Sequence, residues 1–160
     1  MKSPKVAILM GSRSDSDIMA PAAKTLDEFA VAHEVRILSA HRTPEETAAY
    51  VEAAEARGIE VIIAGAGFAA HLAGAVAAHT TLPVIGVPLD SSPLKGIDAL
   101  YSTVQMPGGI PVATMTIGKA GAKNAALFAI QILSRKEPEL VERLKKYRSE
   151  MKEAILSIEL

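Results

Sequence analysis

The stretch KVAILMGSRSDSD, residues 5–17, joins a strand pattern to a polar turn and decides the fold prediction. It begins with a short apolar run of β-prone side chains, which Gly11 ends. The same form returns further along the chain in HEVRIL (33–38), EVIIAG (60–65) and LPVIGV (82–87). We therefore predict β-strands at these four positions.

Helical patterns alternate with these strands. Apolar residues after the first strand recur at three- and four-residue spacings, namely Ile18, Met19, Ala22, Leu26 and Phe29. Thr43, Pro44 and Glu46 together form a capping box that predicts the start of a second helix. Gly58 is expected to end that helix. Strands that are apolar throughout and alternate with helices predict an α/β, doubly wound parallel sheet with helices on both faces.

The second half of the chain follows a looser pattern. Proline and glycine mark loops around a short helix at 97–103, and IPVATMTI (110–117) is predicted as a fifth strand. The alanine-rich segment 120–134 is predicted as a helix buried on most sides, which suggests a contact between subunits. Segment 138–160 is predicted as an amphipathic helix that packs on a neighbouring subunit through the stripe Leu140, Leu144, Tyr147 and Met151. No linker divides the chain, so a single domain spanning 1–160 is expected.

Composition and charge narrow the function classes. A formal net charge of -1 gives no general electrostatic reason to bind nucleic acid or an anionic membrane. The absence of cysteine excludes disulfides, a thiolate nucleophile and a thiolate metal site. No apolar segment approaches the roughly 18 to 20 residues needed to cross a bilayer, and the N-terminal residues lack a signal-peptide pattern. We therefore expect a cytoplasmic protein.

Polar residues follow the first three predicted strands. GSRSDSD comes after the first, SAHRTP (39–44) after the second and GAGFAAHLAG (65–74) after the third. In an open parallel sheet, ligands bind outside the carboxyl ends of the strands. Three loops are therefore expected to deliver polar groups to one edge of the sheet.

The first of these loops has the composition of a phosphate site. Gly11 permits an unusual turn, while the hydroxyls of Ser12 and Ser14 can surround a phosphate together with the amides that start the helix. Asp15 suits a ribose hydroxyl. The alternative is that Ser14, Asp15 or Asp17 only caps the helix. The loop matches neither the dinucleotide nor the nucleoside-triphosphate glycine pattern.

Histidine and arginine mark the other two loops. Arg42 offers a planar fork for phosphate, and His41 beside it changes protonation near neutral pH, although the two could equally form a solvated surface pair. His71 lies between small apolar residues, in a tight and partly dry setting suited to proton transfer. A lone histidine in such a place is more often structural, and His33 and His79 are expected to be so. The set includes no metal-ligand pattern and predicts a metal-free enzyme that acts on a small phosphorylated compound.

From Val6 to Leu133 the chain resembles a known family. The motifs MGSRSD, SAHRTP, VIIAGAG, AAHL, LPVIGVP, LKGIDALYSTVQMPGGIPVAT and IGKAGAKNAAL occur in the order found in class I N5-carboxyaminoimidazole ribonucleotide mutases of bacterial purine synthesis. The resemblance implies a flavodoxin-like fold, a homo-octamer and no metal or organic cofactor. It also implies a reaction that moves a carboxylate from an exocyclic nitrogen to ring carbon C4, by decarboxylation and recapture of carbon dioxide.

The resemblance assigns roles to individual residues. The implied contacts with the ribonucleotide substrate are made by Ser12, Ser14, Asp15, Ser39, Ala40, Arg42, Ala66, Gly67 and Leu72. His71 is implied as the general acid and base at C4, and His41 as a group that helps to hold the carboxylate or carbon dioxide. The loop at 105–109, with Lys123 and Asn124, is implied to close the site without a chemical step.

This chain departs from the family pattern at three positions. Where the family usually has glycine, proline and an aromatic residue, this chain has Phe68, Ala73 and Ser16. Phe68 either takes space from the substrate beside Gly67 or points into a neighbouring core. The second arrangement is favoured, because aromatic side chains are usually buried.

Two other functions remain open from the sequence. The first is the related carboxylase that uses carbon dioxide and aminoimidazole ribonucleotide directly, but its members carry a Ser-Asn pair near the position of AAHL, which favours the mutase. The second is a non-catalytic module that binds FMN or a nucleotide. An aromatic content of 4% without tryptophan makes flavin stacking a weaker prediction.

Overall fold

Five parallel strands form the sheet of the computed structural model, which describes residues 3–158, in the order β2-β1-β3-β4-β5. The strands are β1 (Val6–Met10), β2 (His33–Ile37), β3 (Val61–Ala66), β4 (Val84–Pro88) and β5 (Ala113–Thr114). Ile63 lies between Ile8 of β1 and Ile85 of β4 in register. The strand order reverses beside β1, since the chain runs from β1 outward to β2 and then returns to β3 on the other side. Ligand sites of such sheets lie at this point.

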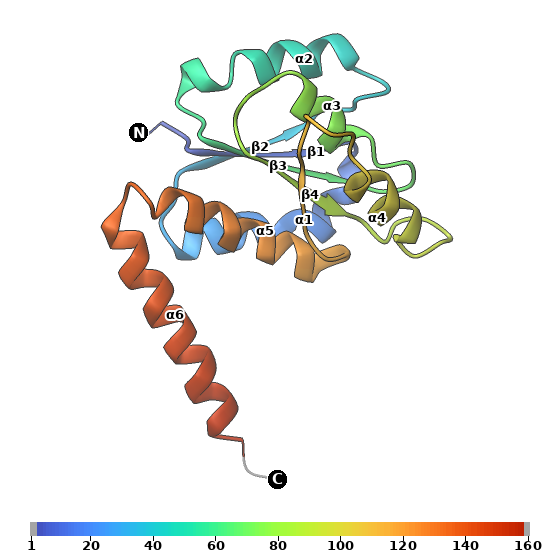
Figure 1. The fold of residues 1–160 in the computed structure, drawn as a ribbon. Helices are drawn as coiled ribbons and strands as arrows, with labels where there is room; N and C mark the ends of the chain where they lie inside the picture. The colour runs from blue at the N-terminus through green and yellow to red at the C-terminus, as the bar shows by residue number, and fades with distance from the viewer. Residues whose placement is uncertain (1–2, 159–160) are drawn as a thin grey trace.

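Helices cover both faces of the sheet, as the alternating pattern predicted. They are α1 (Ser16–Glu28), α2 (Pro44–Glu52), α3 (Leu72–Ala78), α4 (Ile97–Val104), α5 (Gly118–Leu133) and α6 (Pro138–Leu156), with 3-10 turns η1 (Arg13–Asp15) and η2 (Glu55–Arg57). Figure 1 shows α2 and α3 on one side of the sheet and α1 and α5 on the other. The α/β, doubly wound architecture is therefore confirmed.

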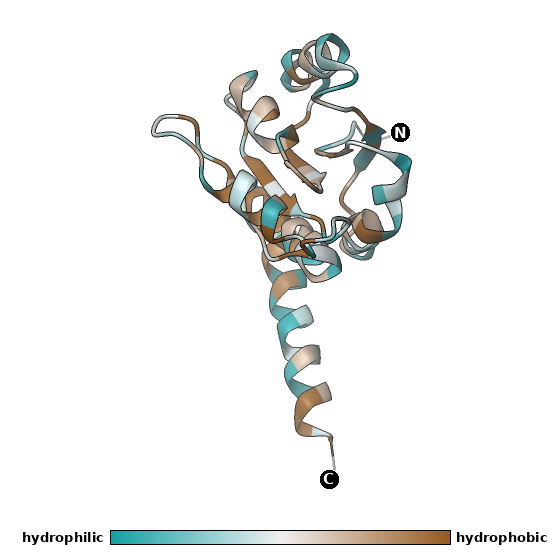
Figure 2. Cartoon of the chain, turned by 90° about the vertical axis from the view of Figure 1, so that its right-hand side faces the viewer, coloured by the Kyte–Doolittle hydropathy of each residue, from teal (hydrophilic) through white to brown (hydrophobic). Residues whose placement is uncertain are grey.

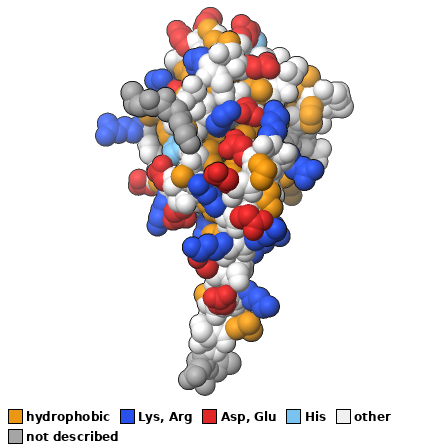
Figure 3. All heavy atoms as spheres, turned by 90° about the vertical axis from the view of Figure 1, so that its left-hand side faces the viewer, with side chains coloured by type: hydrophobic (Ala, Val, Ile, Leu, Met, Phe, Trp, Pro, Cys, Tyr) orange, Lys and Arg blue, Asp and Glu red, His pale blue; other side chains and the backbone are white. Residues whose placement is uncertain are grey.

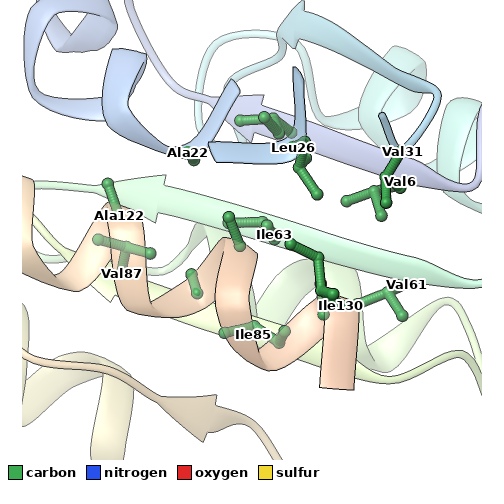
Figure 4. Close-up of a cluster of buried hydrophobic side chains, with 14 of the residues drawn as sticks. Val6, Ala22, Leu26, Val31, Val61, Ile63, Ile85, Val87, Ala122 and Ile130 are labelled. Carbon is green, nitrogen blue, oxygen red and sulfur yellow. The ribbon is translucent and has the colours of Figure 1, made fainter. Parts of the chain in front are cut away.

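The larger apolar layer lies between the sheet and the pair α1 and α5 (Figure 4). Ile63, Ile85 and Ile130 are fully buried there, and burial of each such side chain contributes about 1.5–3 kcal/mol. Glycine is required at Gly121 at the start of α5, because a Cβ there would come within 1.6 Å of the carbonyl oxygen of Thr116, in the segment just before the helix. The packing holds the carboxyl ends of the central strands in place.

Two strand predictions were wrong in detail. The fifth strand was expected over 110–117, but only Ala113–Thr114 pairs with β4. Pro111 precedes this short pairing, and proline cannot donate a ladder hydrogen bond. The second strand is not a buried strand either, since Val35 and Ile37 are 46% and 53% exposed on the edge strand β2.

The predicted capping box at α2 was also wrong. The Thr43 hydroxyl makes no cap hydrogen bond to α2; it accepts one from the Ser39 backbone N–H at 2.9 Å and donates to the Ser39 carbonyl at 3.1 Å. Thr43 therefore closes the loop before the helix. Gly58 does not end α2, which ends at Glu52, so that expectation was wrong. Gly58 instead ends the following turn η2, in the left-handed conformation with φ of +95°.

Helix α5 is not buried on most sides. Its small and apolar face packs against the sheet of the same chain, while its outer face exposes Lys119, Lys123, Asn124 and Phe128. Burial of the apolar face therefore needs no second subunit.

Helix α6 projects from the body of the molecule (Figures 1 and 2). The first part of its predicted stripe packs on its own chain, since Leu140 is buried and Tyr147 meets Phe29 edge-to-face at 5.6 Å. Met151 is 45% exposed, and on the face that Figure 3 shows, the outer part of the helix carries both charged and hydrophobic side chains. The prediction extended to residue 160, and residues 159–160 lie outside the described residues. None of the helices within residues 3–158 has the length and apolarity that a membrane crossing requires.

Candidate functional site

A pocket of about 610 Å³ opens at the carboxyl ends of β1, β2 and β3. It is lined by Gly11, Ser12, Ser14, Asp15, Ser39, Ala40, His41, Arg42, Ala66, Gly67, Phe68, Ala69, His71, Leu72 and Ser91. Every residue for which the sequence predicted a catalytic role or a substrate contact is in this set. The three loops therefore meet at one edge of the sheet, as the parallel topology required.

The first loop is organised by Ser12. Its side chain accepts a hydrogen bond from the Ser14 backbone N–H at 3.3 Å and caps η1, and the Ser14 hydroxyl donates to it at 2.9 Å. Asp15, in contrast, makes no side-chain cap at α1. The expected special turn at Gly11 was wrong, because its φ is not positive and a Cβ there would meet only Asp15 Oδ2 at 3.9 Å.

Asp15 is the buried carboxylate of the pocket, with 7% of its surface exposed. Burial raises the pKa of Asp15, whereas a hydrogen bond with the Ser12 backbone and the positive charge of Arg42 act in the opposite direction. The net shift is upward, so the folded protein holds an ionised Asp15 at a cost to its stability.

Arg42 connects the second loop to the first. Its backbone N–H and its Nε donate to the Ser39 hydroxyl at 3.2 and 3.4 Å, and its Nη2 donates to the Gly11 carbonyl at 2.5 Å. These contacts hold the guanidinium at the pocket rim beside the serine hydroxyls. A guanidinium carries five N–H donors, so donors remain for an anion such as a phosphate.

The two pocket histidines contact one another. His41 Nε2 lies 2.8 Å from His71 Nδ1, and the ring centroids are 4.9 Å apart at 79°. One nitrogen of such a contact donates and the other accepts, so the pair shares one proton. Both residues are exposed, and the expected dry surroundings of His71 are not formed by residues 3–158.

The third loop lies tightly against its neighbours. A Cβ at Gly67 would come within 2.0 Å of the Ser91 hydroxyl oxygen, so a larger residue there would require the Ser91 side chain to rotate away. The Ala70 backbone N–H donates to the Ser102 hydroxyl at 2.9 Å, and Ser102 in turn donates to the Asp98 carbonyl at 2.7 Å. Helix α4 therefore holds the segment that carries His71.

Phe68 has the least expected environment in the pocket. Its φ is +55° and 57% of its surface is exposed, so the prediction that it points into a core was wrong. The left-handed backbone directs the side chain to the pocket rim instead. The same backbone explains why a glycine fits this position, since only glycine adopts it without cost.

Ser91 and Ser102 were missed from the sequence. Ser91 follows β4, and the rule that placed the first three loops at the pocket could also have included this one. Ser102 acts through a contact with a loop 32 residues away, which no local pattern indicates.

Several other candidates lie outside the pocket. The loop at 105–109, Lys123 and Asn124 do not line it. His79 pairs with Glu52 at 3.0 Å, and His33 lies 3.1 Å from the Val31 carbonyl oxygen. Within residues 3–158, no group of three or more histidine, aspartate or glutamate side chains comes together in a way that could hold a metal ion.

The chain is similar to several known proteins. A family model described as AIR carboxylase matches residues 5–154. The N5-carboxyaminoimidazole ribonucleotide mutase of Pyrococcus abyssi is 61% identical over 149 residues, which cover 93% of this chain and 84% of that protein. The protein of the same name from Bacillus subtilis is 56% identical over 153 residues, covering 96% of this chain and 94% of that one. The crystal structure of Treponema denticola PurE matches with a TM-score of 0.86 and 33% identity, covering 96% of this chain and 94% of that chain.

Proposed function

Because the chain belongs to the AIR carboxylase family, we propose that its pocket converts N5-carboxyaminoimidazole ribonucleotide to 4-carboxyaminoimidazole ribonucleotide in purine biosynthesis. The observation that carries the proposal is the contact between His41 and His71 beside the Arg42 guanidinium in one pocket. The curated relatives are mutases with this substrate in their name, and they share more than half of their residues with this chain over nearly its whole length.

In this proposal the ribose phosphate lies at the polar side of the pocket. Arg42 provides a charge-assisted contact for the phosphate, and Ser12, Ser14 and Ser39 provide hydroxyls. The Asp15 carboxylate accepts hydrogen bonds from ribose hydroxyls. Hydrogen bonds within the chain already hold Ser12 and Arg42 in position, which reduces the ordering that binding requires.

The histidine pair handles the proton of the reaction. The carbon–nitrogen bond of the carbamate breaks, the nitrogen retains the electron pair and gains a proton, and carbon dioxide is released into the pocket. Ring carbon C4 then forms a bond to carbon dioxide and loses its own proton. One proton is supplied and one is removed, so the reaction is a net isomerisation. His71 performs both transfers, and His41 holds the shared proton and the carboxylate.

The third loop provides one wall of the space that receives the released carbon dioxide, and the histidine side of that space is open in the single chain. Ala66, Gly67 and Leu72 form a small apolar wall beside the histidines. Confinement keeps the carbon dioxide next to C4, so that recapture competes with escape.

The decisive experiment follows conversion of N5-carboxyaminoimidazole ribonucleotide by the purified protein, with aminoimidazole ribonucleotide plus bicarbonate in a parallel reaction. We expect fast turnover only in the first. Turnover in the second alone would assign the protein to the carboxylases. A yellow protein that turns over neither compound would instead indicate an FMN-binding module.

The proposal extends to assembly and location. A homo-octamer in the cytoplasm is expected from the family resemblance. Exposed apolar side chains on α4 and α6 support self-association, among them Tyr101 (63% exposed) and Leu156 (72%). Light scattering should give a mass near eight chains, and a mass of one chain at micromolar concentration would contradict the assembly.

A further inference from the structure

Phe68 lines the candidate pocket, but the fold does not bury it. It lies in the loop between β3 and α3, next to Gly67 and three residues before His71. Its surface is 57% exposed, whereas Phe29 in the core is 4% exposed. The benzyl group therefore adds little to the packing of the chain, and its apolar surface faces the pocket and solvent.

The backbone at Phe68 makes this exposure more informative. A φ of +55° is unfavourable for a residue with a Cβ, and glycine removes the cost. An exposed side chain offers no burial energy to offset it. A stabilising contact for the ring must therefore come from outside the single chain, and the place of Phe68 in the pocket lining points to a molecule that enters the pocket.

The two sides of the pocket differ in chemistry, and this determines which part of a ribonucleotide reaches Phe68. The first two loops contribute Ser12, Ser14 and Arg42, which suit a phosphate. The third loop contributes Phe68 with small or apolar neighbours and His71. A phosphate bound at the first side leaves the heterocycle at the histidine side, beside the benzyl ring.

We propose that Phe68 is a binding residue that stacks on the planar imidazole ring of the substrate and holds that ring over the histidine pair. The inference rests on the proposed function for the identity of the ring. Offset or edge-to-face contacts between flat rings contribute beyond the area they bury, and they orient the ring as well as retain it. A glycine at this position would offer no side chain for the substrate ring to contact.

A tryptophan at this position reports the contact directly, because the chain contains no other tryptophan. In Phe68→Trp, 4-carboxyaminoimidazole ribonucleotide should change the emission in a saturable way. Ribose 5-phosphate lacks the ring and should compete for the pocket without producing that change. Phe128→Trp is the matched control, since Phe128 is 36% exposed on α5 outside the pocket, and its emission should not respond.

Kinetics provide the second readout. Phe68→Leu keeps an apolar side chain and the same backbone cost but removes the flat ring, so its KM should rise about three- to tenfold, while Phe68→Tyr should keep the KM of the parent. Phe68→Gly should unfold at a higher temperature than the parent, and it should also show the raised KM.

The outcomes separate this inference from the proposed function. If the parent protein turns over the substrate but Phe68→Trp does not respond and Phe68→Leu keeps the parental KM, the stacking inference is overturned and the function stands. If the parent shows no turnover but Phe68→Trp responds to the ribonucleotide and not to ribose 5-phosphate, stacking stands and the function is overturned. Emission that is blue-shifted without ligand and insensitive to ligand would show that a second copy of the chain covers Phe68, which also overturns the inference.

Discussion

The Nε2 atom of His41 and the Nδ1 atom of His71 lie 2.8 Å apart, although 30 positions separate the two residues in the chain. One nitrogen donates the hydrogen bond and the other accepts it, so substitution of either histidine removes the hydrogen-bond partner of the other. This contact makes the two side chains one functional unit, and it makes the effect of their substitution non-additive.

His41→Asn and His71→Asn should each lower kcat by roughly a hundred- to ten-thousandfold, the range typical of a lost acid-base group. The double variant should be no slower than the slower single variant, because groups that act as a unit are lost together. Single-turnover rates at saturating substrate measure both effects. Multiplied losses in the double variant would show that the histidines act independently, and parental turnover in His71→Asn would remove the proposed mechanism.

Arg42→Ala should raise the KM for the ribonucleotide about ten- to a hundredfold, because charge-assisted hydrogen bonds contribute roughly 1.5–3 kcal/mol each. The melting temperature should fall only modestly, since Arg42 is exposed at the rim and the variant keeps the backbone bond to Ser39 but loses the side-chain contacts with Ser39 and Gly11. Arg135→Ala is the control for loss of charge, because Arg135 is exposed and lies outside the pocket. Equal KM values in Arg42→Ala and the parent would show that Arg42 does not bind the phosphate.

Asp15→Asn should separate binding from stability. Burial raises the pKa of Asp15 above its ordinary value of 3.8. Between pH 3.8 and the raised pKa, the folded state keeps a proton that the unfolded state has lost. The free energy of unfolding therefore falls as the pH rises through this interval. At neutral pH the variant should therefore be more stable than the parent, with a difference that closes as the pH falls below 3.8.

The same Asp15→Asn substitution should raise the KM about tenfold, since the amide no longer offers a charged acceptor to the ribose. Asp17→Asn is the control, because Asp17 is exposed in the first turn of α1 and favours the helix N-terminus when charged. Urea unfolding across pH 3 to pH 8 measures the difference in stability between the parent and Asp15→Asn, and steady-state kinetics measure the KM. A less stable Asp15→Asn at neutral pH would contradict the burial cost described for Asp15.

Ser102→Ala should act on catalysis through the third loop. Its hydroxyl accepts the hydrogen bond of the Ala70 N–H, and loss of this contact frees the segment before His71. We expect kcat to fall about tenfold with KM nearly unchanged, because small displacements of an acid-base group reduce the rate more than binding. Ser102→Thr keeps the hydroxyl and should restore kcat.

Thr103→Val is the matched control for Ser102→Ala. The Thr103 hydroxyl donates to the Ala99 carbonyl within α4 and does not contact the loop, so its loss should lower stability without a specific loss of kcat. A Ser102→Ala variant that loses stability but keeps the parental kcat would show that Ser102 is structural only.

The sequence alone determined the class of the fold and which three loops meet at the pocket. Apolar runs that end in glycine or polar turns predicted β1, β3 and β4, and the parallel order then placed residues 11–15, 39–42 and 66–72 at one edge. These predictions succeeded because strand periodicity and the edge rule depend on near neighbours in the chain and on topology.

Only the tertiary structure decided which atoms meet. The partner of the Thr43 hydroxyl, the burial of Asp15 and the contact between His41 and His71 each depend on segments that approach in space. The exposure of Phe68 has the same origin, since a left-handed backbone at one residue turns an aromatic side chain from an expected core toward the pocket. Residue types report the energy of local conformations, whereas hydrogen-bond partners and burial are set by non-local packing, which a single sequence does not display.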